Sequence, residues 1–62
     1  MALTKEQIRQ AKRWMDTYRR EYSTPTALAE ACGDELQLYE DRIEWVIDAE
    51  VFEMALNYYE EA

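Results

Sequence analysis

Pro25 is the only proline in the 62 residues, and it constrains the fold more than any other position. Its ring disfavours α-helical geometry at the preceding residue, so a helix that starts near the N-terminus has to end near Ser23. Proline is favoured at the first position of a helix, and Thr24 before it is a suitable N-cap. Gly33, the only glycine, is a typical C-terminal stop. The sequence therefore predicts one helix before Ser23 and a short second helix over residues 25–32.

The first helix has a well-marked start and two different faces. Thr4 and Gln7, three residues apart, form a capping box, and Leu3 and Ile8 are placed to pack across it as a hydrophobic staple. One face is apolar at the spacings of three and four residues that an α-helix requires. This face comprises Ile8, Ala11, Met15, Tyr18 and Tyr22. The opposite face is mainly basic and comprises Lys5, Arg9, Lys12, Asp16 and Arg19.

Residues 34–47 admit two interpretations. As a β-hairpin, the segment has apolar residues at alternate positions on both sides of a turn at residues 39–42. These residues are Leu36 and Leu38 before the turn, and Ile43, Trp45 and Ile47 after it. As a helix, it has an apolar stripe formed by Leu36, Tyr39, Ile43 and Ile47. We favour the hairpin because the second run is rich in β-branched and aromatic residues.

A last helix is predicted over residues 49–61, because the polar stripe shifts at Asp48 and Asp48 is a favourable N-cap. The expected fold class is a small α+β domain dominated by helices and covering residues 1–62. Two N-terminal helices are followed by a short β-hairpin and a C-terminal helix, in the order ααββα. An all-α three-helix bundle is the alternative.

The composition excludes several kinds of chemistry. There is no histidine to act as a general base or metal ligand, and a single cysteine, Cys32, cannot form an intrachain disulfide. One glycine is too few for a glycine-rich phosphate loop. We therefore expect no enzymatic activity, no cofactor and no metal site. The lone thiol and the lack of a secretory signal or membrane span favour the cytoplasm. Because so short a chain has a small core, a homodimer is also considered.

Charge is distributed unevenly along the chain. Residues 1–29 carry six basic and three acidic side chains (net +3), whereas residues 30–62 carry one basic and eleven acidic side chains (net −10). Either the two ends attract each other within the fold, or one sign faces a partner. On the second interpretation the chain is an acidic module that docks on a basic protein, in the manner of phage-type inhibitors or DNA mimics. The candidate docking residues are Asp34, Glu35, Glu40, Asp41, Glu44 and Asp48.

A weaker pattern points to nucleic acid. Ala29 lies four residues before Gly33, which resembles the turn of helix-turn-helix proteins, and the expected element order resembles part of a winged helix. This resemblance covers residues 26–47 and implies DNA binding. However, residues 34–41 contain four carboxylates, which phosphates would repel. The alternative nucleic-acid surface is therefore the basic face of the first helix, with Lys5, Arg9, Lys12, Arg13 and Arg20.

Overall fold

The first helix, α1 (Lys5–Tyr18), begins at the predicted capping box. The Thr4 hydroxyl oxygen accepts a hydrogen bond from the Gln7 amide at 3.1 Å, and the Gln7 side-chain oxygen accepts from the Thr4 amide at 2.9 Å. The computed structural model describes residues 3–60. In it, α1 ends before Ser23 and is followed by a 3-10 turn, η1 (Arg19–Glu21). Tyr18 was expected on the buried face but is exposed, because it lies at the end of α1 and stacks on Trp14 instead, with ring centroids 4.7 Å apart.

The second helix, α2 (Pro25–Leu36), starts where Pro25 predicts, and the Thr24 hydroxyl accepts from the Ala27 amide at 3.2 Å. The predicted end at residue 32 is wrong, because α2 continues through Gly33 to Leu36 and is capped by Gln37, whose φ of 56° is left-handed. Gly33 is buried under β2. A Cβ at this position would lie 2.6 Å from Cγ2 of Ile47. Glycine is therefore needed here for close packing, and it does not form the turn of a helix-turn-helix motif.

A two-stranded antiparallel hairpin follows, as predicted, so the all-α alternative is wrong. Strand β1 (Tyr39–Asp41) pairs with β2 (Val46–Ile47), and the register shifts between Tyr39 and Asp41. The turn occupies residues 42–45 and not the predicted 39–42, because α2 extends further along the chain. Leu38 and Ile47 are buried as expected, whereas Ile43 and Trp45 lie in the turn and are exposed. The predicted alternation of buried residues therefore fails in the turn.

The last helix, α3 (Ala49–Glu60), begins after Asp48 as predicted. One carboxylate oxygen of Asp48 accepts from the Glu50 amide at 2.9 Å, which is the expected capping bond. The predicted final position, Glu61, lies outside the described residues. Together the elements give a small helix-dominated fold in the order ααββα, with the hairpin between α2 and α3.

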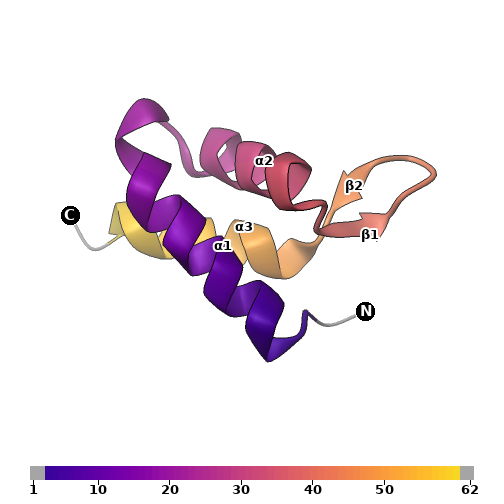
Figure 1. Cartoon of the computed structure of the whole chain (residues 1–62). Coiled ribbons are helices and arrows are strands. Elements are labelled where there is room, and N and C mark those ends of the chain that lie inside the picture. The colour runs from indigo at the N-terminus through magenta and orange to yellow at the C-terminus, as the bar shows by residue number, and fades with distance from the viewer. Residues whose placement is uncertain (1–2, 61–62) are drawn as a thin grey trace.

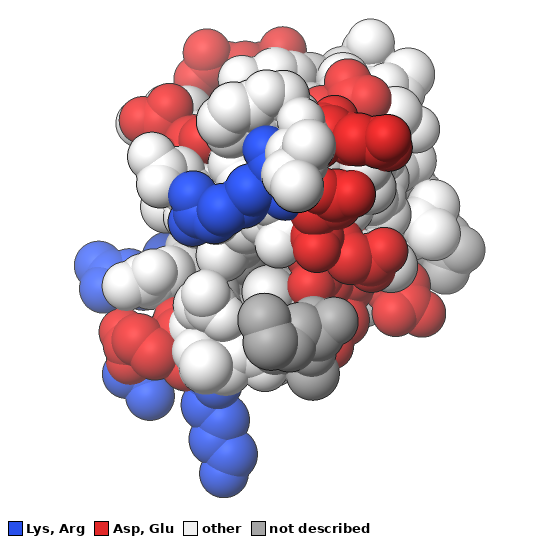
Figure 2. Space-filling model, turned by 90° about the vertical axis from the view of Figure 1, so that its right-hand side faces the viewer, with Lys and Arg blue, Asp and Glu red and all other residues white. Residues whose placement is uncertain are grey.

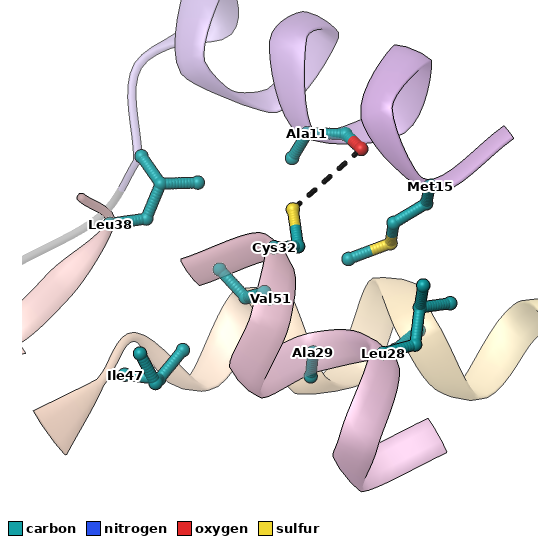
Figure 3. Close-up of a cluster of buried hydrophobic side chains, with 9 residues drawn as sticks. Ala11, Met15, Leu28, Ala29, Cys32, Leu38, Ile47 and Val51 are labelled. Atoms are coloured by element: carbon teal, nitrogen blue, oxygen red, sulfur yellow. Dashed lines mark hydrogen bonds between the residues drawn. The ribbon is translucent and has the colours of Figure 1, made fainter. Parts of the chain in front are cut away.

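The three helices pack on one another, and the hairpin projects from one end of the helical body (Figure 1). The core between the helices contains Ala11, Met15, Leu28, Ala29, Cys32, Leu38, Ile47, Val51 and Ala55. Figure 3 shows that Cys32 of α2 points toward α1, where its thiol donates to the Ala11 carbonyl at 3.9 Å. Because the core lies among the helices, the distal part of the hairpin contributes no residue to it.

Candidate functional site

The predicted docking residues do not all reach the surface. Asp34 and Glu35 at the end of α2, and Glu40 and Glu44 in the hairpin, are exposed, and Asp41 is half-buried. Asp48 is only 4% exposed, because its carboxylate is used to cap α3. Asp48 therefore has to be removed from the candidate docking surface, whereas the structure brings the other five to one end of the molecule.

Within the described residues, no ion pair joins the acidic half of the chain to the basic half. Among the side chains that the structure describes, one ion pair is present, between Arg9 and Glu6 at 3.1 Å, and both belong to α1. Figure 2 shows acidic side chains gathered in a band along one side of the face that carries the hairpin. The expectation that the two ends attract each other is therefore not supported by ion pairs in the described part of the chain. Apart from Asp48, the carboxylates between residues 30 and 59 are exposed or half-buried.

The turn of the hairpin is held by a side chain. One carboxylate oxygen of Asp41 accepts from the backbone amides of Ile43 at 2.9 Å and Glu44 at 3.3 Å. This is the local hydrogen-bonding pattern by which aspartate replaces a missing backbone partner in turns. The carboxylate of Asp41 thus shapes the loop, in addition to contributing charge.

The hairpin tip, defined here as residues 42–46, exposes apolar side chains. Ile43 is 90% exposed, Trp45 is 64% exposed and Val46 is 42% exposed. The sequence pattern does not reveal this patch, because alternating apolar residues predict a strand with one buried face. A signal was available in Asp41, whose preference for turns would have placed the loop after it.

Trp45 is held against the helical body through Tyr39. The two rings meet edge to face with centroids 5.1 Å apart, and the Tyr39 hydroxyl donates to the carboxylate of Asp34 at 2.8 Å. The guanidinium of Arg42 lies over the Tyr39 ring, 5.9 Å from its centroid. The hydrogen bond to Asp34 raises the pKa of Tyr39 above its usual value, because it stabilises the protonated phenol. The tip is thereby linked to α2.

The cations of the alternative surface, on α1 and η1, are exposed, but carboxylates lie among them. Lys5, Arg9, Lys12, Arg13 and Arg20 are all exposed, the first four on α1 and the last in η1. Arg9 is paired with Glu6, and Asp16 lies on the same helix face. The structure thus brings these cations to one side of the molecule but interrupts them with carboxylates.

Other reactive groups have structural roles. Burial raises the pKa of the Cys32 thiol to about 11, which disfavours the thiolate that a nucleophile requires. Tyr58 of α3 donates from its hydroxyl to the carboxylate of Asp16 at 2.6 Å. The Arg19 guanidinium donates to the Tyr58 carbonyl at 2.7 Å. Across residues 3–60, no group of three thiol or carboxylate side chains is arranged to hold a metal ion.

Comparisons with protein-family models, curated proteins and solved structures give no match to this chain. No helix within residues 3–60 is long and apolar enough to cross a membrane. The hairpin and its carboxylates are therefore the features of this chain that bear most on its function.

Proposed function

We propose that this chain is a small acidic interaction module that docks on the basic surface of a partner protein. The observation that carries the proposal is that exposed carboxylates of α2 and the hairpin form no ion pair with the chain's own cations in the described residues. Uncompensated carboxylates on one side of a protein attract a basic surface, orient the approaching partner and accelerate association.

The proposed docking surface consists of five residues, Asp34, Glu35, Glu40, Asp41 and Glu44. A protein that binds nucleic acid offers a suitable basic surface, because it must contact phosphates through Lys and Arg. A module docked there would exclude the nucleic acid and inhibit its partner, as a DNA mimic does. We expect this to occur in the cytoplasm without a cofactor and without enzymatic activity.

Charge reversal tests the proposal. The double variant Glu40→Lys/Glu44→Lys changes the net charge by the same amount as the control Glu21→Lys/Glu30→Lys, in which both exposed residues lie on the helical body. Proteins retained from a lysate at low and high salt would be compared for the three chains. We expect the hairpin variant and high salt to abolish retention of the same protein, because salt screens charges over about 8–10 Å. Retention that is equal in all three chains and insensitive to salt would contradict the proposal.

Nucleic-acid binding through α1 is a second candidate, favoured by the exposure of Lys5, Arg9, Lys12, Arg13 and Arg20. Its test is a fluorescence anisotropy titration with labelled single-stranded and double-stranded DNA. Binding that is lost in Arg9→Glu/Arg13→Glu and kept in Glu40→Lys/Glu44→Lys would support this candidate over docking on a protein. Absent binding, or binding unchanged by the arginine substitutions, would dismiss it.

A further inference from the structure

The exposed apolar side chains of the hairpin tip require an explanation that charge does not give. Single exposed apolar residues are ordinary on protein surfaces. Here, however, Ile43, Trp45 and Val46 lie close together in sequence at the hairpin tip, which projects from the helical body (Figure 1). Contiguous exposed apolar side chains with polar neighbours are typical of surfaces that bind another molecule. Tryptophan is also among the residues most enriched at the centres of protein interfaces.

We infer that the hairpin tip is the anchor of the interface, with Trp45 and Ile43 entering an apolar pocket of a protein partner whose rim carries Lys and Arg. This inference rests on the proposed function and specifies the kind of surface that the partner presents. The charged residues then orient and retain the partner at the rim. The apolar side chains at the centre, once removed from water, supply most of the affinity.

Contacts within the chain already order the hairpin tip before a partner binds. Asp41 fixes the turn through the amides of Ile43 and Glu44, and the Tyr39 ring limits the movement of the Trp45 indole. Trp45, in the turn, also has a left-handed backbone φ of 58°, which is uncommon for a bulky residue. A loop that is already ordered loses less conformational entropy on binding than a flexible one.

The charges around the tip select among possible occupants. Glu40 is exposed just before the turn, Asp41 lies at its base, Glu44 is exposed within it, and Arg42 is the one cation among residues 40–46, which leaves this segment with a net charge of −2. This net negative charge disfavours nucleic acid and anionic lipid. A symmetric dimer joined tip to tip would bring three carboxylates and one Arg42 from each copy together, which is a net repulsion. An apolar pocket surrounded by Lys and Arg on a different protein is complementary to both features of the tip.

The test uses two substitutions at the tip, each made separately. Trp45→Asn removes the indole but suits the left-handed backbone, which asparagine tolerates better than tryptophan does. Ile43→Ser removes a side chain that is almost entirely in solvent. Leu56→Ser is the matched control, because Leu56 is an exposed apolar residue of α3 outside the hairpin. Thermal melts by circular dichroism verify that each chain is folded.

Each variant is immobilised alongside the wild type and Glu40→Lys/Glu44→Lys, and proteins retained from a lysate of the source cells are quantified by mass spectrometry. The protein whose retention differs most between the wild type and the variants is then purified, and its binding to the wild type and to each variant is measured by titration. We expect Trp45→Asn and Ile43→Ser each to weaken its binding by at least about 30-fold, as expected for a central residue of an interface. Glu40→Lys/Glu44→Lys and high salt should also weaken binding, whereas Leu56→Ser should not.

The remaining outcomes separate the inference from the proposed function. If charge reversal abolishes binding and the tip substitutions leave it unchanged, the anchor is refuted and acidic docking stands. If the tip substitutions weaken binding, whereas charge reversal and high salt leave it unchanged, both the basic rim and acidic docking are refuted. If neither the tip substitutions nor the charge reversal changes the retention of any protein, both proposals fail. Light scattering that shows a dimer lost in Trp45→Asn would identify a second copy as the occupant and refute the inference. Trp45-dependent binding to phosphatidylserine vesicles would refute it in favour of a membrane.

Discussion

Gly33→Ala is a sensitive test of how the hairpin packs on α2. In the interior of an ordinary helix this substitution raises the free energy of unfolding by about 0.5–1 kcal/mol, because alanine loses less backbone entropy on folding. Here the added Cβ would lie 2.6 Å from Cγ2 and 2.7 Å from Cδ1 of Ile47. Cδ1 can rotate away, but Cγ2 is attached to Cβ of a buried strand residue and moves only if χ1 or the backbone changes.

Overpacking of this kind destabilises a core by about 1–3 kcal/mol. After subtracting the helical gain, we expect Gly33→Ala to lower the free energy of unfolding by up to about 2.5 kcal/mol, with about 1 kcal/mol as the central value. For a chain of this length the melting temperature would fall by on the order of 10 °C. The assay is urea and thermal unfolding followed by circular dichroism, in a stabilising osmolyte so that every variant remains folded.

A double-mutant cycle identifies the clashing atoms. Ile47→Val removes Cδ1 but keeps Cγ2, so Gly33→Ala should still destabilise the chain in that background. Ile47→Ala removes every clashing atom and by itself costs about 2–5 kcal/mol, but Gly33→Ala should then stabilise the chain by about 0.5–1 kcal/mol. A change of sign between these two backgrounds is the expected result. An increase in stability on making Gly33→Ala in the wild-type chain would refute the reasoning.

Four further predictions concern single groups. Asp48→Ala should lower the free energy of unfolding, measured in urea, by about 1 kcal/mol because the Glu50 amide loses its capping acceptor. Asp48→Asn should stay near the wild-type value, and equal losses in the two variants would contradict the capping role. Gln37→Gly should raise stability by up to about 1 kcal/mol by relieving the left-handed φ of 56°, and a loss on urea unfolding would argue against strain there. Burial, with a hydrogen bond to a neighbouring carboxylate, raises the pKa of Tyr58 to about 12. The contribution of Tyr58 to the free energy of unfolding should therefore be fully present below about pH 10 and be lost between about pH 10 and 12, and Tyr58→Phe should reduce the decline in stability over that interval; an unchanged pH profile in that variant would be evidence against it. Burial raises the pKa of Cys32 to about 11, so a thiol reagent at neutral pH should label it only as fast as the chain opens, and labelling at the rate of a free thiol would disprove its burial.

The sequence predicts the parts of the fold that depend on local interactions. The capping box at Thr4 and the Thr24–Pro25 pair mark the starts of α1 and α2, and Asp48 marks the start of α3. Each signal acts within one helical turn, so neighbouring residues suffice to identify it. The element order followed from these three starts together with the β-branched residues after position 42.

The errors arise where distant contacts decide the structure. Gly33 would end an isolated helix, but it is retained inside α2 because Ile47, fourteen positions later, packs against its backbone. The extended helix displaces the turn along the chain, and the displacement moves Ile43 and Trp45 from an expected strand to the surface. The most informative part of the candidate site was therefore missed for a reason that lies in tertiary packing, which a local pattern does not contain.

The position of α3 at the end of the described fold has a consequence for biosynthesis. Val51 and Ala55 of α3 lie at the centre of the core, and the Tyr59 hydroxyl of the same helix donates to the carbonyl of Tyr22, which follows η1, at 2.8 Å. A ribosome delivers α1 and α2 first, before α3 can cover the faces of these two helices that pack against it. The nascent chain therefore completes its core only after α3 has emerged, and early termination of translation before α3 would release a chain without a stable native state.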